Sequence, residues 1–228
     1  MPDAAPNPAL LRSLGKLARG LSCLFWGLPA ALLVCANAVR GDIMPVSGLA
    51  PVVASLGLLC FGLWLMGDFQ KQERPWRAAL DRATFTALVN LGLSPFLFWW
   101  SRVPGETFFL CGVGTLAVSG LVFLFNLNLV LARLGAMLPD ETLRQETKLF
   151  TGVNRVLLVT LVAVAAGAAL LFNFREIPLP LGATIVVLNR AAQVALLLLL
   201  LLPLAMTMAL IWKTKEVILE SVFGARTG

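Results

Sequence analysis

The sequence predicts an all-α integral membrane protein: a six-helix transmembrane bundle with an N-terminal amphipathic interfacial helix and both termini in the cytoplasm. Three observations predict it: the composition, six long apolar stretches, and the distribution of Lys and Arg between them. The chain is 59% hydrophobic and 13% charged, whereas roughly a quarter of the residues of a soluble domain are charged. We therefore expect lipid, rather than water, to surround most of the chain.

Six stretches match or approach the length of about 20 apolar residues that a helix needs to cross the hydrocarbon layer. Trp64, Trp99, Trp100 and Trp212 lie at their ends, where aromatic rings favour the headgroup layer. The predicted spans are 21–39, 46–67, 83–100, 107–132, 156–174 and 193–212. Together they form one domain, 21–212, preceded by the interfacial helix 1–20 and followed by a cytoplasmic tail, 213–228, which continues helical spacing as far as Phe223.

The Lys and Arg residues alternate in density from one gap between spans to the next. Fourteen of the 18 lie in the first, third, fifth and last segments outside the spans, and the other four are Arg40, Arg102, Arg175 and Arg190. Cytoplasmic segments carry such an excess, so the bias predicts both termini inside. The net charge of +6 is then explained by anionic lipid at the cytoplasmic face, with no nucleic acid partner.

The N-terminal segment has an apolar and a basic side. Asn7 can cap a helix that begins at Pro8, with leucines on one side and Arg12, Lys16 and Arg19 on the other. We expect this helix to lie flat on the inner surface as an anchor, with docking of a cytosolic partner as the alternative. A second alternative is cleavage after Ala38 as a signal peptide, which the long apolar run disfavours.

The first span carries a strip of small residues, Cys23, Gly27, Ala31 and Cys35, at every fourth position. Such a strip allows a neighbouring backbone to approach closely, so it predicts a packing seam. Since the chain has no histidine and its four cysteines have no paired spacing, a metal site is not expected.

Polar residues enter the predicted membrane region along two further strips. Thr86, Asn90 and Ser94 recur at every fourth position of the third span, and Thr115, Ser119 and Asn126 follow the fourth. The connection between these spans is short enough to make them antiparallel neighbours. We expect hydrogen bonds between the two helices, and the alternative is a pathway for a neutral solute.

Two segments predicted to be cytosolic, 68–82 and 138–150, carry charges of both signs. Arg74, Arg77, Asp140 and Arg144 are the predicted contacts with a membrane or cytosolic protein partner, and Asp140 and Arg144 can pair at a spacing of four. On the outer side, residues 177–188 are apolar but too short to span, so they are interpreted as either a re-entrant or an interfacial segment. Arg190, which follows them, is the candidate functional charge of the outer leaflet.

The chemistry that an enzyme would need is missing. Without histidine the chain cannot form a His-ligated metal site or a Ser-His pair. All twelve Asp and Glu residues lie outside the predicted spans or at their edges, and no phosphate-binding glycine loop is present. We therefore predict no catalytic, cofactor-binding or metal-binding residues.

The leading functional hypothesis is a non-catalytic assembly, scaffold or accessory subunit of a membrane complex. The alternative rests on layout. The chain has an amphipathic lead-in helix, six spans, a charged loop after the second span and a hydrophobic outer loop before the sixth. This layout resembles that of permeases of ATP-driven exporters of the ABC-2 type. That resemblance implies a separate ATPase in contact with the N-terminal helix and residues 68–82. The excess of Arg over Lys and the absence of Tyr are typical of GC-rich genes and suggest a bacterial cytoplasmic (inner) membrane.

Overall fold

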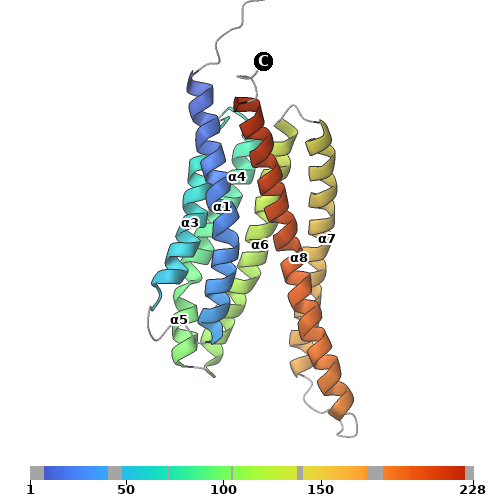
Figure 1. Cartoon of the computed structure of the whole chain (residues 1–228). Helices are drawn as coiled ribbons and strands as arrows, with labels where there is room; N and C mark the ends of the chain where they lie inside the picture. Colours follow the sequence, from blue (N-terminus) through green and yellow to red (C-terminus); the bar gives the residue numbers. More distant parts are fainter. Residues whose placement is uncertain are drawn as a thin grey trace, which may run out of the picture.

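The computed structural model is an all-α bundle and describes residues 8–40, 48–70, 72–103, 105–137, 141–173 and 182–223, which contain no strand. Side chains are not described for 8–10, 141–143, 165–197 and 221–223 within these ranges. The helices are α1 (Pro8–Arg40), α3 (Ala50–Met66), α4 (Arg74–Leu93), α5 (Pro95–Arg102), α6 (Thr107–Met137), α7 (Glu141–Asn173) and α8 (Gly182–Phe223). In Figure 1 the start of α1, the α3–α4 connection, the facing ends of α6 and α7, and the end of α8 all lie at the top. We call this end of the bundle the basic end.

The α1–α3 pair is held by close backbone approach. A Cβ atom on Gly20 would lie 2.7 Å from the carbonyl oxygen of Gly62, and one on Gly62 would lie 3.0 Å from that of Gly20. Farther along, a Cβ on Gly27 would lie 2.7 Å from Leu59 Cδ2, and Ala31 is buried. The predicted small-residue seam is thus found on α1, and Gly20 extends it toward the basic end.

The third apolar stretch is broken into two helices at Ser94. Pro95 opens α5 because its ring fixes φ and it has no backbone N–H to continue the α4 ladder. The Ser94 backbone N–H donates to the Leu91 carbonyl oxygen, three residues back, at 3.3 Å. The Ser94 hydroxyl donates to the same oxygen at 2.7 Å. Beyond Pro95, the Phe96 ring lies against Gly112, where a Cβ would meet it at 2.3 Å, so α5 packs closely on α6.

Several helices extend well beyond the predicted spans. Helix α7 begins at Glu141 rather than at 156, and α8 runs from Gly182 to Phe223 rather than over 193–212. The extensions at the basic end are joined by ion pairs between Lys16 and Asp68 and between Glu146 and Lys213. The first ion pair joins α1 to the α3–α4 connection, and the second joins α7 to α8. The predicted helical continuation of the last span to Phe223 is confirmed.

One sequence-based expectation differs from the structure, and a second falls only partly within the described residues. Residues 8–20 do not form a separate flat helix, since α1 is continuous to Arg40 and its apolar side, with Leu17 and Leu21 fully buried, packs in the core. Within 177–188, residues 182–188 are the first turns of α8, while 177–181 lie outside the described residues. Burial of the apolar side of α1 explains the first continuation, because packing of an apolar face stabilises a helix in a protein more than propensity does.

Five helical segments of the described residues are long and apolar enough to cross a membrane. They are Leu11–Arg40, Arg74–Arg102, Thr107–Met137, Arg144–Val164 and Leu198–Glu220. Helix α3 matches the predicted second span but has 17 residues, about 25 Å at 1.5 Å per residue. It is therefore at the lower limit for spanning a hydrocarbon layer of about 30 Å.

Candidate functional site: a polar cluster between α6, α7 and α8

The two predicted polar strips lie on helices that pack along each other, α4 and α6. Asn90 and Ser94 are buried, Thr86, Ser119 and Asn126 are half-buried, and Thr115 is exposed. The Thr86, Ser94 and Thr115 hydroxyls all donate to carbonyls of their own helix. Among the described residues no hydrogen bond joins the two strips, so the predicted interhelical bonding is not formed there.

A different set of polar side chains joins three helices. Asn128 on α6 and Asn154 on α7 each donate from Nδ2 to Thr207 Oγ1 on α8, at 3.0 Å in both cases. Thr207 in turn lies 3.3 Å from Asn128 Oδ1 and donates to the Pro203 carbonyl at 2.7 Å. All three side chains are at most 3% exposed, so we call Asn128, Asn154 and Thr207 the polar cluster.

The polar cluster lies where α8 contains a proline. Pro203 has no N–H, so the preceding turn of α8 loses one backbone hydrogen bond. Its own carbonyl accepts from the Thr207 hydroxyl and, at 3.4 Å, from Asn154 Nδ2. A threonine that bonds back to the turn before it bends a helix slightly. The two asparagines therefore bind α8 at the turn where Pro203 removes a backbone hydrogen bond.

Next to the polar cluster, one face of α7 carries further polar atoms. Thr147 Oγ1, Thr151 Oγ1 and Asn154 Oδ1 are buried and have no hydrogen-bond partner in the described part of the chain. Asn128 and Thr151 also line a cavity of about 80 Å³ between α6 and α7, whose rim includes Arg155. The rest of its lining is mostly apolar, with Phe125, Leu129 and Leu158, and Asn128 and Thr151 supply polar groups that a water molecule or a small neutral solute could bind.

The chemistry of this region is neutral. The groups of the polar cluster are amides and hydroxyls, which donate and accept hydrogen bonds but do not ionise near neutral pH. The Arg155 guanidinium is exposed and lies 5.9 Å from the centre of the Phe125 ring. Among the residues whose side chains are described, no Lys, Arg, Asp or Glu is buried. The arrangement can link helices or hold neutral molecules, and it offers no general acid or base.

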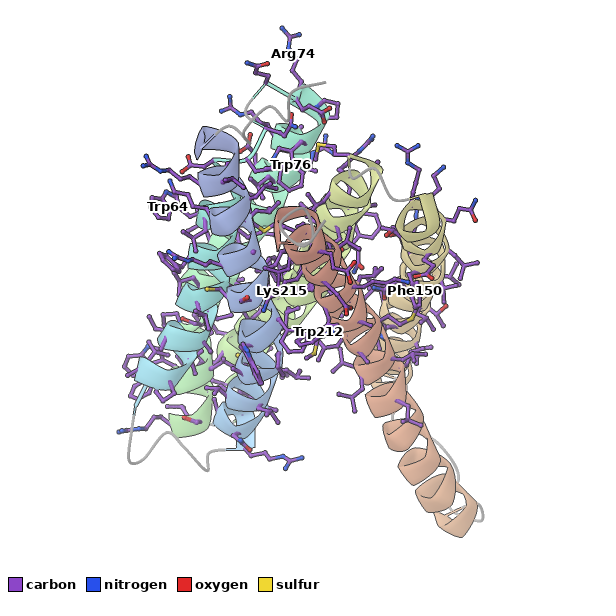
Figure 2. All side chains as sticks on the ribbon, turned by 45° about the horizontal axis from the view of Figure 1, so that its top comes forward. Trp64, Arg74, Trp76, Phe150, Trp212 and Lys215 are labelled. Carbon is purple, nitrogen blue, oxygen red and sulfur yellow. The ribbon has the colours of Figure 1, made fainter. Side chains whose placement is uncertain are left out.

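The remaining predicted site residues lie apart from the polar cluster. Arg74, Arg77 and Arg144 are exposed at the basic end, where Figure 2 shows Arg74 at the tip of α4. Arg144 Nη2 donates to the Ala136 carbonyl at 2.7 Å, which ties the start of α7 to the end of α6. Asp140 lies outside the described residues, as does the Arg190 side chain on the first part of α8.

Sequence analysis did not select Asn128, Asn154 or Thr207. A signal was present on α7, because Thr147, Thr151, Asn154 and Leu158 recur at spacings of four, three and four, which is one helical face. Starting the fifth span at Val156 excluded three of these four residues. Asn126 was preferred to Asn128 because it continued the spacing of Ser119, whereas the structure buries Asn128.

Comparison with known proteins identifies no relative: no family model, curated protein or solved structure matches this chain.

Proposed function

We propose that the chain is a multi-pass integral membrane protein that acts as a non-catalytic assembly or accessory subunit of a membrane complex, in a bacterial cytoplasmic membrane. The observation that carries the proposal is how the buried polar groups are used. Asn128, Asn154 and Thr207 bind one another across three helices, and no ionisable side chain is buried where side chains are described. Buried ionisable groups mark ion pathways and catalytic sites in membrane proteins, so a structural role fits better.

The membrane assignment is supported by the five long apolar helices. The orientation is supported by the basic end, since the four segments that carry most Lys and Arg residues meet there (Figure 1). With that end in the cytoplasm, the chain follows the positive-inside rule.

Cysteine labelling tests insertion and orientation. The four native cysteines are free thiols and are first replaced. In that background, Arg77→Cys and Arg144→Cys should react with a membrane-impermeant maleimide only after the cytoplasmic membrane is permeabilised. Arg40→Cys and Arg102→Cys should react in intact cells. Labelling of Arg77→Cys and Arg144→Cys from opposite sides would contradict the proposal.

Purification in a mild detergent tests assembly. We expect the chain to elute with a second protein, and Arg74→Glu with Arg77→Glu to weaken that association by reversing charge on an exposed surface. Arg40→Glu with Arg102→Glu, which reverses two exposed arginines at the other end, is the matched control and should leave it unchanged. A stable, monomeric chain from the native host would count heavily against an assembly role.

One observation favours a second candidate, the permease subunit of an ATP-driven exporter. The ion pair between Lys16 and Asp68 brings the start of α1 beside the α3–α4 connection, the two segments that would contact an ATPase. Pro203 would then serve as a bend in a moving helix. Nucleotide-stimulated turnover in the purified complex would favour this candidate, and its absence with an ATPase bound would exclude it.

A further inference from the structure

Helix α7 carries one arginine, Arg155, in the apolar part of the bundle. Nine residues earlier on the same helix, Glu146 pairs with Lys213, and Lys213 directly follows Trp212, the end of the last predicted span. Nine residues extend about 14 Å along a helix at 1.5 Å per residue, which is farther than an arginine side chain reaches. The fifth predicted span begins at 156, but this pairing places the level of its cytoplasmic edge near Glu146. Arg155 therefore lies below the headgroup layer rather than in it.

The packing of α6 beside α7 gives the same depth. The Arg155 guanidinium lies 5.9 Å from the centre of the Phe125 ring on α6. Phe125 is eight residues, about 12 Å, from Arg133, the first charged residue after the fourth predicted span. Arg155 and Phe125 are both exposed, and α7 lies at the edge of the bundle (Figure 1). Two neighbouring helices therefore place this cation on the lipid-facing surface, within the hydrocarbon layer.

This chain supplies no counter-ion for Arg155 at that depth. Arg155 forms no ion pair among the described residues, and all twelve Asp and Glu residues lie outside the predicted spans or at their edges. The guanidinium stays charged, and ionisable residues within a membrane pair with another group. A cavity of about 80 Å³, lined in part by Arg155, Asn128 and Thr151, leaves room beside it for a carboxylate. The counter-ion therefore comes from another molecule.

The surface that continues from Arg155 away from the basic end is formed by exposed valines. On each helix they follow at spacings of three or four residues, which is one helical face. They are Val122 and Val118 on α6, beyond Phe125, and Val159 and Val162 on α7, beyond Arg155. A valine in a helix has one strongly preferred rotamer, so little side-chain freedom is lost when another helix packs on it. Because membrane helices associate through close packing, this face suits a neighbouring helix.

We propose that the α6–α7 face binds a transmembrane helix of a partner subunit, in which an Asp or Glu carboxylate pairs with Arg155. The inference rests on the assembly function proposed above and specifies the chemistry of the partner. A carboxylate on a helix fits better than a lipid phosphate, because a partner helix carries its side chains at this depth, whereas phosphates lie in the headgroup layer. The same helix covers the valines, so its carboxylate and its apolar residues bind one continuous surface.

Site-specific cross-linking in native membranes identifies the partner. A photoreactive benzoylphenylalanine replaces Val159 in the full chain, and the cross-linked peptide is sequenced by mass spectrometry. We expect a segment of about 20 apolar residues that contains one Asp or Glu. A partner segment without an acid would overturn the proposal, and so would cross-links to lipid alone while a partner still co-purifies.

Charge exchange tests the ion pair itself. Arg155→Glu should lower the amount of co-purified partner at least about tenfold, and replacing the partner's acid with Arg should restore it in the Arg155→Glu background. Lys148→Glu, the same reversal at an exposed position of α7 two residues from Glu146, is the matched control and should retain the partner. Equal loss in both variants, or no restoration by the exchange, would overturn the proposal.

Arg155→Leu separates partner binding from folding. It removes a charge from the hydrocarbon layer, so the isolated chain should unfold in detergent at the wild-type temperature or above, while the partner is lost. A lower unfolding temperature would show that Arg155 stabilises the chain itself and would overturn the proposal. A chain without any partner in native membranes would refute the assembly function as well, whereas retained association in Arg155→Leu would refute this site alone.

Discussion

The α1–α3 pair and the α6–α7–α8 group are joined in different ways. At the first, Gly20 and Gly62 bring the two helix backbones close together. At the second, Asn128, Asn154 and Thr207 hydrogen-bond across the helices, with neighbouring polar atoms left unpaired on α7. In lipid, helices associate through close packing and through hydrogen bonds rather than through the hydrophobic effect. In this chain, close packing joins the α1–α3 pair and hydrogen bonds join the α6–α7–α8 group.

The difference determines how each half tolerates substitution. The glycine seam depends on the absence of atoms, so any added side chain must push the helices apart. The polar cluster depends on particular donors and acceptors, so a substitution of the same shape can remove the interaction without disturbing the packing. Three predictions follow this contrast from the largest effect to the smallest.

Gly62→Val should destabilise the chain most, by about 3 kcal/mol, the upper end of the range for overpacked interiors. A Cβ there would lie 3.0 Å from the Gly20 carbonyl oxygen and 3.1 Å from Cys23 Cβ, and the backbone of α1 cannot yield locally. Thermal unfolding in detergent, followed by size-exclusion chromatography, measures the loss. Gly57→Val is the matched control because a Cβ on Gly57 meets nothing within 4 Å; comparable losses in both variants would show that the seam is not the cause.

Thr207→Val should cost about 1–2 kcal/mol, since it preserves shape and removes the hydroxyl that accepts from both asparagines, which keep only the carbonyls of Leu124 and Pro203 as acceptors. The same thermal assay applies. Thr160→Val is the control, because Thr160 is exposed and its hydroxyl bonds to Val156 of its own helix at 2.9 Å. If Thr207→Val and Thr160→Val unfold at the same temperature, the polar cluster does not hold the three helices together.

Asn90→Leu should change stability least, by less than about 0.5 kcal/mol. Asn90 is 4% exposed and its Oδ1 has no hydrogen-bond partner in the described part of the chain, so the replacement gives up little bonding and removes a buried polar group. A yield and an unfolding temperature equal to those of the wild type would agree with this prediction. A clear loss of folded protein would instead restore the interhelical role that the sequence predicts for Asn90.

The sequence predicted the elements better than the contacts between them. Each of the six predicted apolar stretches overlaps a helix, although α3 is short and the third stretch is divided at Ser94. The small-residue strip on α1 predicted a packing seam that the structure contains. Depth and spacing also predicted hydrogen bonds between the polar strips on α4 and α6, and the described residues do not form them. However, spacing along one helix does not specify how it is rotated about its axis. That rotation turns Asn128 inward and leaves Asn126 half-buried.

The sequence alone determined that the chain is helical, which segments are apolar, and which connections are basic, because these depend on local composition and periodicity. Only the tertiary structure decided that Gly20 faces Gly62, that three helices share the Thr207 hydroxyl, and that Glu146 pairs with Lys213. Each of these juxtaposes residues 42 or more positions apart, and such distances depend on the angle and rotation at which helices pack.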